Sequence, residues 1–315
     1  MEKMDDLLFA ASTVLPLLLL MSAGLLSRKA GLLNDGLVKG INQLVFKLFL
    51  PINLCHSIMT TSYDVDIAGT IFWYVPAALA VWVSLLMLII PHLEKDRKKV
   101  GVMIQGCFRA NYAFFGIPLV GMLFPGQDTS LAALLVIVTI PVYNLAAVAV
   151  LSIYCGGEVR LRKILLNIAR NPLIIGSVSG YLLWTLRIRL PGFLETTMSN
   201  LGKIASPLAL FTLGGAMYFA SAKAHRRQLF IGLMGKLVIS PALFLSLAVA
   251  LGFRGVPLAC VLVAFGAPTA VASYPMAQQM GGDGALAAEQ VAMSSAFSIL
   301  TTFLMVFLLK TFALI

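Results

Sequence analysis

Charged side chains are scarce in this sequence. Asp, Glu, Lys and Arg make up 11% of the 315 residues, whereas hydrophobic residues make up 60%. The mean hydropathy is +0.95. Soluble domains carry about 25% charged residues, and a water-soluble globule of this length could not hide so much apolar side chain. The composition therefore excludes an ordinary soluble domain and predicts an all-α integral membrane protein.

Histidine and cysteine are rare as well. The chain has three histidines and four cysteines, and Cys55, Cys107, Cys155 and Cys260 are scattered through apolar segments without the spacing of a metal site. Cysteines of this kind usually pack as small hydrophobic residues. The apolar segments also hold no paired carboxylates and no pairing of a nucleophile with a base. We therefore expect no metal, no cofactor and no enzymatic activity.

Long runs without charge dominate the remaining chain. Ten such runs are at least sixteen residues long. Spanning a bilayer takes about 20 residues, so the shorter runs must extend past a flanking charge. We predict ten transmembrane helices, at 7–27, 36–58, 68–92, 100–124, 129–155, 166–187, 197–221, 229–252, 255–280 and 287–310.

The basic residues favour one face of this arrangement. The connections after the first, third, fifth and seventh predicted helices hold twelve Lys and Arg residues, and the opposite face holds five. The positive-inside rule puts the twelve in the cytoplasm, so we predict a multi-pass protein of the inner (cytoplasmic) membrane with both termini outside. The net charge of +10 is then explained first by topology and second by contact with anionic membrane lipid. No nucleic-acid partner is expected.

Helix-breaking residues recur at a constant distance along the chain. The pairs are Pro16 and Pro172, Gly24 and Gly180, and Pro51 and Pro207, each 156 residues apart, with Pro118 and Pro275 at 157. This register predicts an N-terminal five-helix repeat at 1–157 and a C-terminal five-helix repeat at 158–315. Because five is odd, the second repeat must enter the membrane from the opposite side. Inverted repeats are typical of secondary transporters, whose substrate sites lie near the bilayer midplane.

Glycine and proline interrupt the fourth and ninth predicted helices. The fourth contains RANYAFFGIPLVG and the ninth FGAPTAVASYPMAQQMGG, with Asn111 and Pro268 at equivalent positions. Proline lacks an N–H and clashes with the carbonyl four residues back, and hydrocarbon cannot satisfy the freed backbone groups. We therefore predict two broken helices that line a functional site. Simple kinks in packed helices are the alternative.

These two segments carry a resemblance to a known family. The run Asn-x-x-x-x-Gly-Ile-Pro-Leu at 111–119 and PTAVASYPMAQQMGGD at 268–283 resemble signatures of the auxin efflux carrier family, as do NPLIIGSVSG at 171–180 and SPLALFTLGGAM at 206–217. The family includes bacterial malate and malonate permeases and is similar to the plant auxin exporters. One departure is Ala113, where the family often has glycine.

The resemblance implies a specific architecture. Ten helices would form two inverted five-helix repeats, with helices 1, 2, 6 and 7 as a scaffold. Helices 3–5 and 8–10 would form a transport unit in which broken helices 4 and 9 cross. Asn111, Pro118 and Pro268 match the crossover positions of the family. Transport would proceed by an alternating-access movement of this unit against the scaffold.

One arginine lies deep in the fourth predicted helix. Arg109 is close to mid-membrane, where a charge costs at least ~2.5–3.5 kcal/mol. The apolar segments offer no acidic partner besides Glu289, at the mouth of the tenth helix. We therefore expect the guanidinium to bind a substrate carboxylate through two parallel hydrogen bonds. A structural ion pair or a contact with backbone carbonyls is the alternative.

Polar and aromatic residues near the two breaks are expected to complete the site. They supply amide, hydroxyl and backbone groups for the anion and aromatic faces for an organic body. The predicted substrate-binding residues are Arg109, Asn111, Tyr112, Gly116, Pro118, Asn144, Pro268, Thr269, Ser273 and Tyr274.

Other lysines within the predicted membrane helices are interpreted first as structural residues. Lys236 is expected to extend its ammonium to the membrane surface. Lys47 and Lys203 are 156 residues apart, each four residues before a proline. Each either bonds the carbonyl freed by that proline or reaches the interface. The alternative is a charged lining on the scaffold face of the substrate path.

These features predict a secondary transporter (permease) of small organic anions, such as mono- or dicarboxylates. Three alternatives stay open: a sodium-coupled symporter of bulkier anions resembling the bile-acid symporters, a membrane enzyme, and a non-transporting membrane receptor. The coupling ion, H+ or Na+, is also open, with Glu289 the one embedded candidate for carrying a proton. A homodimer is a further partner that the sequence leaves open.

Overall fold

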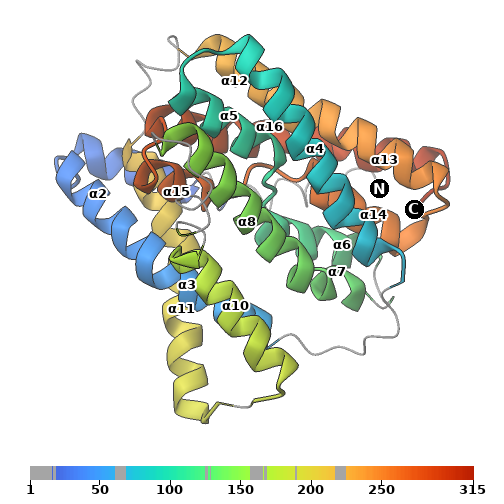
Figure 1. Cartoon of the computed structure of the whole chain (residues 1–315), viewed down its shortest axis with the longest axis horizontal. Helices are drawn as coiled ribbons and strands as arrows, with labels where there is room; N and C mark the ends of the chain where they lie inside the picture. The colour runs from blue at the N-terminus through green and yellow to red at the C-terminus, as the bar shows by residue number, and fades with distance from the viewer. Residues whose placement is uncertain are drawn as a thin grey trace.

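The computed structural model describes residues 19–60, 69–124, 129–156, 169–188, 190–216 and 225–315, together with Pro16, Gln127 and Leu166. These residues form helices and no β-strand (Figure 1). Among them, four helices are long and apolar enough to cross a membrane, and a fifth qualifies if Gly284–Ser298 and Leu300–Thr311, bent by 41°, count as one span. The prediction of an all-α membrane protein is confirmed.

The named helical elements carry the labels of Figure 1. Residues 19–29 are also helical and precede them. In chain order the elements are α2 (Asp35–Leu44), η1 (Val45–Phe49), α3 (Leu50–Met59), α4 (Ile71–Leu93), α5 (Arg97–Phe108), η3 (Tyr112–Gly116), α6 (Ile117–Leu123), α7 (Ser130–Leu134), α8 (Val136–Cys155), α10 (Pro172–Thr185), α11 (Gly192–Ala216), α12 (Arg226–Met234), η4 (Gly235–Ile239), α13 (Ser240–Ala250), α14 (Gly255–Gly266), α15 (Ser273–Gln279) and α16 (Gly284–Thr311).

Asparagine and aspartate side chains begin several of these helices. The Asn171 side chain accepts a hydrogen bond from the N–H of Leu173, and Pro172 occupies the first helical position of α10. Both features favour a helix start, which explains why α10 begins at 172. The Asp283 side chain caps α16 in the same way by accepting from the N–H of Leu286.

Three wide turns precede prolines. The π-helical elements η1, η3 and η4 each end two residues before a proline, namely Pro51, Pro118 and Pro241. Proline lacks an N–H and its ring crowds the carbonyl four residues back. A single π-turn relieves this crowding within an otherwise continuous helix, and such turns are frequent at functional sites.

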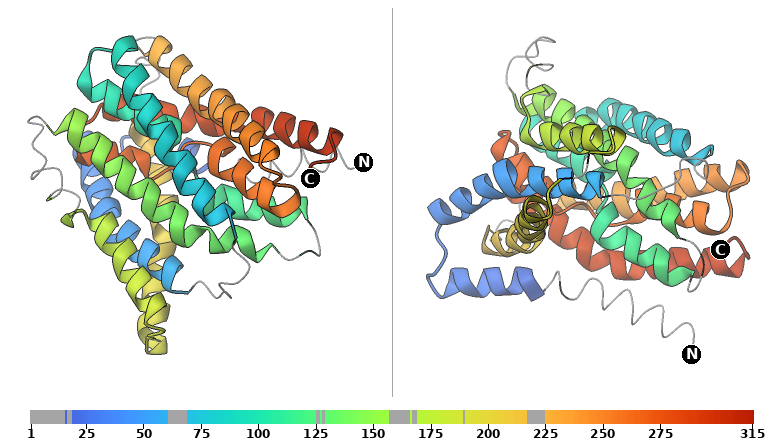
Figure 2. Two further views of the ribbon diagram at one scale, coloured as in Figure 1. Left: turned by 45° about the vertical axis from the view of Figure 1, so that its right-hand side comes forward. Right: turned by 90° about the horizontal axis from the view of Figure 1, so that it is seen from below.

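The helices form two groups in space. The small group contains residues 19–29 with α2, η1, α3, α10 and α11, and the large group contains α4 to α8 and α12 to α16. Figures 1 and 2 show α10 and α11 projecting from the rest of the molecule, whereas α4, α5, α8 and α12 to α14 pack beside one another.

Glycines let helices of the small group pack closely. A Cβ added at Gly176 would overlap the backbone of Pro51, and one added at Gly180 would overlap the backbone of Cys55. These glycines hold α10 against α3. Small residues serve this purpose in membranes because helix association there depends on close van der Waals contact.

Candidate functional site

The two interrupted helices meet at their breaks. α5 ends at Phe108 and α14 ends at Gly266. The short extended segments that follow run antiparallel, with the N–H of Asn111 donating to the carbonyl of Pro268 at 2.8 Å. The N–H of Ala270 donates to the carbonyl of Arg109 at 3.0 Å. These bonds satisfy backbone groups that the breaks expose, and we call this region the crossover.

The Arg109 side chain is buried at the crossover, with 4% of its surface exposed. Its Nη2 donates to the Asn144 side-chain oxygen at 2.7 Å, and its Nη1 contacts the Met276 sulfur at 2.9 Å. Both partners are neutral. No carboxylate pairs with this guanidinium within the described residues.

Asn144 extends this contact to the other helix group. It lies on α8, and its amide nitrogen donates to the Ser177 hydroxyl on α10 at 3.3 Å. That hydroxyl donates in turn to the Leu173 carbonyl at 2.9 Å. The chain of hydrogen bonds from Arg109 therefore ends on the small group, so the buried charge lies beside the boundary between the two groups.

Several predicted site residues gather at the crossover with Arg109. Thr269 donates its hydroxyl to the Gly106 carbonyl at 2.9 Å. The Asn111 amide nitrogen and the Ser273 hydroxyl are buried and have no hydrogen-bond partner within the described residues. Buried polar groups are usually paired, so these two are available to a bound molecule.

Other predicted residues point elsewhere. The Tyr112 hydroxyl donates to the Ala132 carbonyl on α7 at 2.9 Å, away from Arg109 and Asn144. A Cβ at Gly116 would overlap the Val263 side chain, so this glycine is needed for packing against α14. Pro118 lies in α6, where it follows the π-turn η3.

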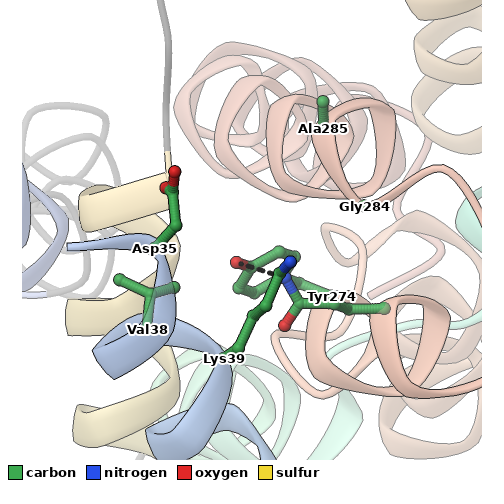
Figure 3. A pocket seen from close by; sticks show the side chains of 7 residues that line it. Asp35, Val38, Lys39, Tyr274, Gly284 and Ala285 are labelled. Carbon is green, nitrogen blue, oxygen red and sulfur yellow. Dashed lines mark hydrogen bonds between the residues drawn. The ribbon is translucent and has the colours of Figure 1, made fainter.

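Tyr274 faces a separate cavity at the group boundary. The cavity has a volume of about 140 Å³. Figure 3 shows Asp35, Val38 and Lys39 of α2 opposite Tyr274. Tyr274 precedes Met276 by two residues, so the two side chains leave α15 on roughly opposite faces. Tyr274 therefore does not join Arg109 at one open site in this structure, because α15 lies between them.

A polar contact joins the two groups beside this cavity. The Asn42 amide on α2 donates to the Gln278 side-chain oxygen on α15 at 2.7 Å, and the Thr212 hydroxyl on α11 donates to the Asn42 oxygen at 2.7 Å. Gln278 also donates to the Tyr274 hydroxyl at 3.5 Å (Figure 3). Asn42 and Gln278 were not predicted from the sequence, although amides in otherwise apolar spans were the available signal.

Lys236 was also misjudged from sequence. We expected its ammonium to reach the membrane surface, but its side chain is 0% exposed and donates to the Phe265 carbonyl at 3.2 Å. That carbonyl belongs to the last turn of α14, whose partial negative charge attracts a cation. Lys47 and Lys203, by contrast, are exposed at the surface of the small group.

Comparison with known proteins identifies the family of the chain. The profile of the membrane transport protein family matches residues 9–154 and 158–306, which is most of the chain. The chain belongs to this family, that of the auxin efflux carriers. The resemblance inferred from the crossover motifs is confirmed.

A protein of Methanocaldococcus jannaschii that is described as an uncharacterized transporter is 23% identical to this chain over 302 residues. The alignment covers 91% of this chain and 94% of the relative. Both findings support transport across a membrane as the general function of this family member.

Proposed function

We propose that this chain is a secondary transporter of small organic anions and that Arg109 binds their carboxylate. The observation that carries the proposal is a guanidinium with 4% exposure whose hydrogen-bond partners are an amide and a thioether. A buried charge is costly without an opposite charge. A substrate carboxylate would supply that charge and would match the planar fork of arginine.

Lys236 is the internal comparison for this argument. Arg109 follows the last residue of α5, and the Lys236 ammonium lies at the end of α14. At both helix ends the helix dipole favours positive charge. Lys236 donates directly to the terminal carbonyl of Phe265, which is a structural role. The Arg109 guanidinium instead contacts the side chains of Asn144 and Met276. A neutral amide can yield to a carboxylate, so Arg109 is the better anion receptor.

Substrate binding would require movement between the two helix groups. Arg109 is covered in this structure, and the contacts of Asn144 with Ser177 and of Gln278 with Asn42 cross the boundary. Parting these contacts would open the crossover on one side of the molecule. The proposal therefore treats the small group as a scaffold and the large group as a transport unit that moves in alternating access.

A repeated contact supports two inverted five-helix repeats at 1–157 and 158–315. A Cβ at Gly24 would overlap the carbonyl of Phe211, and one at Gly180 would overlap the carbonyl of Cys55. The offsets agree, since 180 − 24 = 156 and 211 − 55 = 156. We accordingly propose ten membrane helices in the inner membrane with both termini outside.

Uptake by proteoliposomes tests the function. Radiolabelled malonate and lactate serve as dicarboxylate and monocarboxylate probes, and neutral malonamide serves as the control for charge. The account expects saturable uptake of at least one carboxylate and none of the amide. A requirement for sodium would favour the symporter alternative, and uptake of malonamide at the same rate would contradict anion transport.

Lys236, which is also a buried cation, provides the matched control variant for Arg109. Arg109→Ala is expected to abolish carboxylate uptake, whereas Lys236→Met removes a buried charge on the α14 side of the crossover and is expected to retain it. Both proteins must be monodisperse by size exclusion before comparison. Equal loss in both variants would reduce Arg109 to a structural role.

A further inference from the structure

Outside the crossover, a buried histidine and a buried glutamate lie beside a partly exposed aspartate. His225 precedes α12, and its Nδ1 lies 3.0 Å from a Glu289 carboxylate oxygen on α16. Its Nε2 lies 3.6 Å from a carboxylate oxygen of Asp283, the residue that caps α16. His225 is 7% exposed and Glu289 is 4% exposed.

This arrangement depends on the charge of the imidazole ring. A protonated imidazole donates from both nitrogens, so it can bond both carboxylates at once. A neutral imidazole has one N–H and can donate to only one of them. Loss of the proton would also leave two carboxylates close together without the cation between them, which is unfavourable in a buried setting.

The surrounding elements bring further charged groups to this region. α5 and α16 pack against α12, and the Asp283 N–H donates to the Lys98 carbonyl at 3.4 Å. α15 contributes no charged residue. The charged residues on α12, on η4, and on α5 with the connection before it are Arg226, Arg227, Lys236, Glu94, Lys95, Asp96, Arg97, Lys98 and Lys99. α11, which also packs against α16, carries Glu195 and Lys203.

The first turns of α16 connect the cluster to the crossover. Gln290 follows Glu289, and a Cβ at Gly106 or at Gly232 would overlap its buried amide. One turn later, the Ser294 hydroxyl accepts a hydrogen bond from the N–H of Thr269 at 3.1 Å. A shift of α16 against α12 would therefore also displace the backbone of the crossover.

We propose that His225, Glu289 and Asp283 form a proton-binding site whose occupancy controls access to the crossover. The bound proton holds the starts of α12 and α16 together and thereby stabilises the covered arrangement of Arg109. Proton loss loosens this contact and favours carboxylate binding. The inference rests on the proposed function only for its effect on the carboxylate; the proton site itself can be tested without a substrate.

Thermal unfolding between pH 5 and pH 8 tests the site directly. Histidine is the side chain whose charge ordinarily changes in this range, and His56 and His92 are the other histidines of the chain. The unfolding temperature of the purified protein is expected to fall as the pH rises. His225→Gln and Glu289→Gln should each flatten this profile, whereas His56→Gln and His92→Gln should leave it unchanged.

Binding of malonate and lactate to the same proteins tests the link to transport. Wild-type affinity is expected to rise by at least about fivefold from pH 5 to pH 8, the lower end of usual coupling between sites. His225→Gln should show little change. Glu289→Gln serves as the second variant in case His225→Gln does not fold.

The outcomes separate this inference from the proposed function. A wild-type protein that binds neither probe at any pH overturns anion binding, while its unfolding profile still decides whether the proton site exists. Unfolding profiles of His225→Gln and Glu289→Gln that keep the wild-type slope overturn the proton site. A flattened unfolding profile with an unchanged pH dependence of affinity overturns the coupling to the crossover.

Discussion

Arg109 and Asn144 form the contact on which the site depends. A hydrogen bond from a charged donor contributes about 1.5–3 kcal/mol, and the guanidinium donates to the Asn144 oxygen at 2.7 Å. The amide satisfies part of the arginine without neutralising it. The charge therefore remains available to an incoming carboxylate that displaces or joins the amide.

Supplying an internal anion should block the site. Asn144→Asp places a carboxylate where the guanidinium already donates, and the resulting ion pair should compete with substrate. We expect carboxylate binding to fall by at least about tenfold, with unfolding temperature unchanged or raised. Isothermal titration with malonate and a thermal melt measure the two effects.

Asn171→Asp is the matched control for this change. It introduces the same charge, but Asn171 caps α10, and aspartate caps as well as asparagine. Binding should be retained. Undiminished affinity in Asn144→Asp would show that Arg109 does not receive the anion.

At the scale of elements, glycine contacts set the stability of the small group. Gly176→Ala would push a methyl group into the Pro51 backbone, which cannot move aside as a flexible side chain could. We expect a loss of about 1–3 kcal/mol, typical of overpacking, measured as a lower unfolding temperature in detergent.

Gly40→Ala in α2 is the control for this substitution. A Cβ at Gly40 meets nothing within 4 Å, and alanine favours a helix over glycine by up to about 1 kcal/mol. This variant should be neutral or more stable. Equal destabilisation of the two variants would contradict the packing explanation.

The connection between α4 and α5 should respond to acid. Glu94 accepts hydrogen bonds from the N–H of Asp96 at 2.9 Å and from the Gln228 amide of α12 at 2.6 Å. The Asp96 N–H, and then the Gln228 amide, lower the pKa of this carboxyl. Its stabilising contribution is therefore present above the unfolded pKa, about 4.3, and is lost as the pH falls through the lowered folded value.

Glu94→Gln should accordingly unfold at a lower temperature than wild type at pH 7, and the difference should shrink below about pH 4. Differential scanning fluorimetry across this range measures it. Glu195→Gln at the exposed start of α11 is the control. A difference that grows as the pH falls would contradict the assignment.

Much of this element structure follows from local sequence signals. The apolar runs predict the helices, and the clustered proline and glycine residues predict both breaks, because those signals act within a turn or two of the chain. The hydrogen-bond partners of Tyr112 and Lys236 could not be predicted from these signals. Tyr112 donates to a carbonyl of α7, and Lys236 donates to a carbonyl in the last turn of α14. These partners depend on which helices are neighbours in the folded protein.

The site residues show the same difference between local sequence signals and contacts that depend on the fold. Arg109 could be proposed from the sequence because a charge in an apolar run is conspicuous by itself. Asn42 and Gln278 were missed because their importance arises only where α2 and α15 meet. Gly116 was assigned to the substrate site, and its close contact with Val263 of α14 could not be predicted from the sequence.

At the scale of the whole molecule, the proposed mechanism requires the two helix groups to move apart. A reducible bifunctional thiol reagent that joins Asn42→Cys to Gln278→Cys would tie the groups together at this contact. In a background without the native cysteines, we expect cross-linking to stop malonate uptake and reduction to restore it. Gel mobility after proteolysis between the halves verifies the cross-link.

A cross-link within the large group is the control. Glu94→Cys and Gln228→Cys replace two residues whose side chains are hydrogen-bonded within the large group, so uptake should continue after the same reagent joins them. Uptake that persists with the first pair fully cross-linked would contradict movement of the groups against each other.

The central claim is that the buried guanidinium of Arg109 binds the transported carboxylate. Equilibrium binding of malonate and lactate to purified Arg109→Ala tests it most directly, with monodispersity and unfolding temperature checked in parallel. Loss of two charge-assisted hydrogen bonds predicts at least about 100-fold weaker binding, and Arg109→Lys should bind weakly because it keeps the charge without the fork. A folded Arg109→Ala protein that binds either probe within about threefold of wild type would contradict the account.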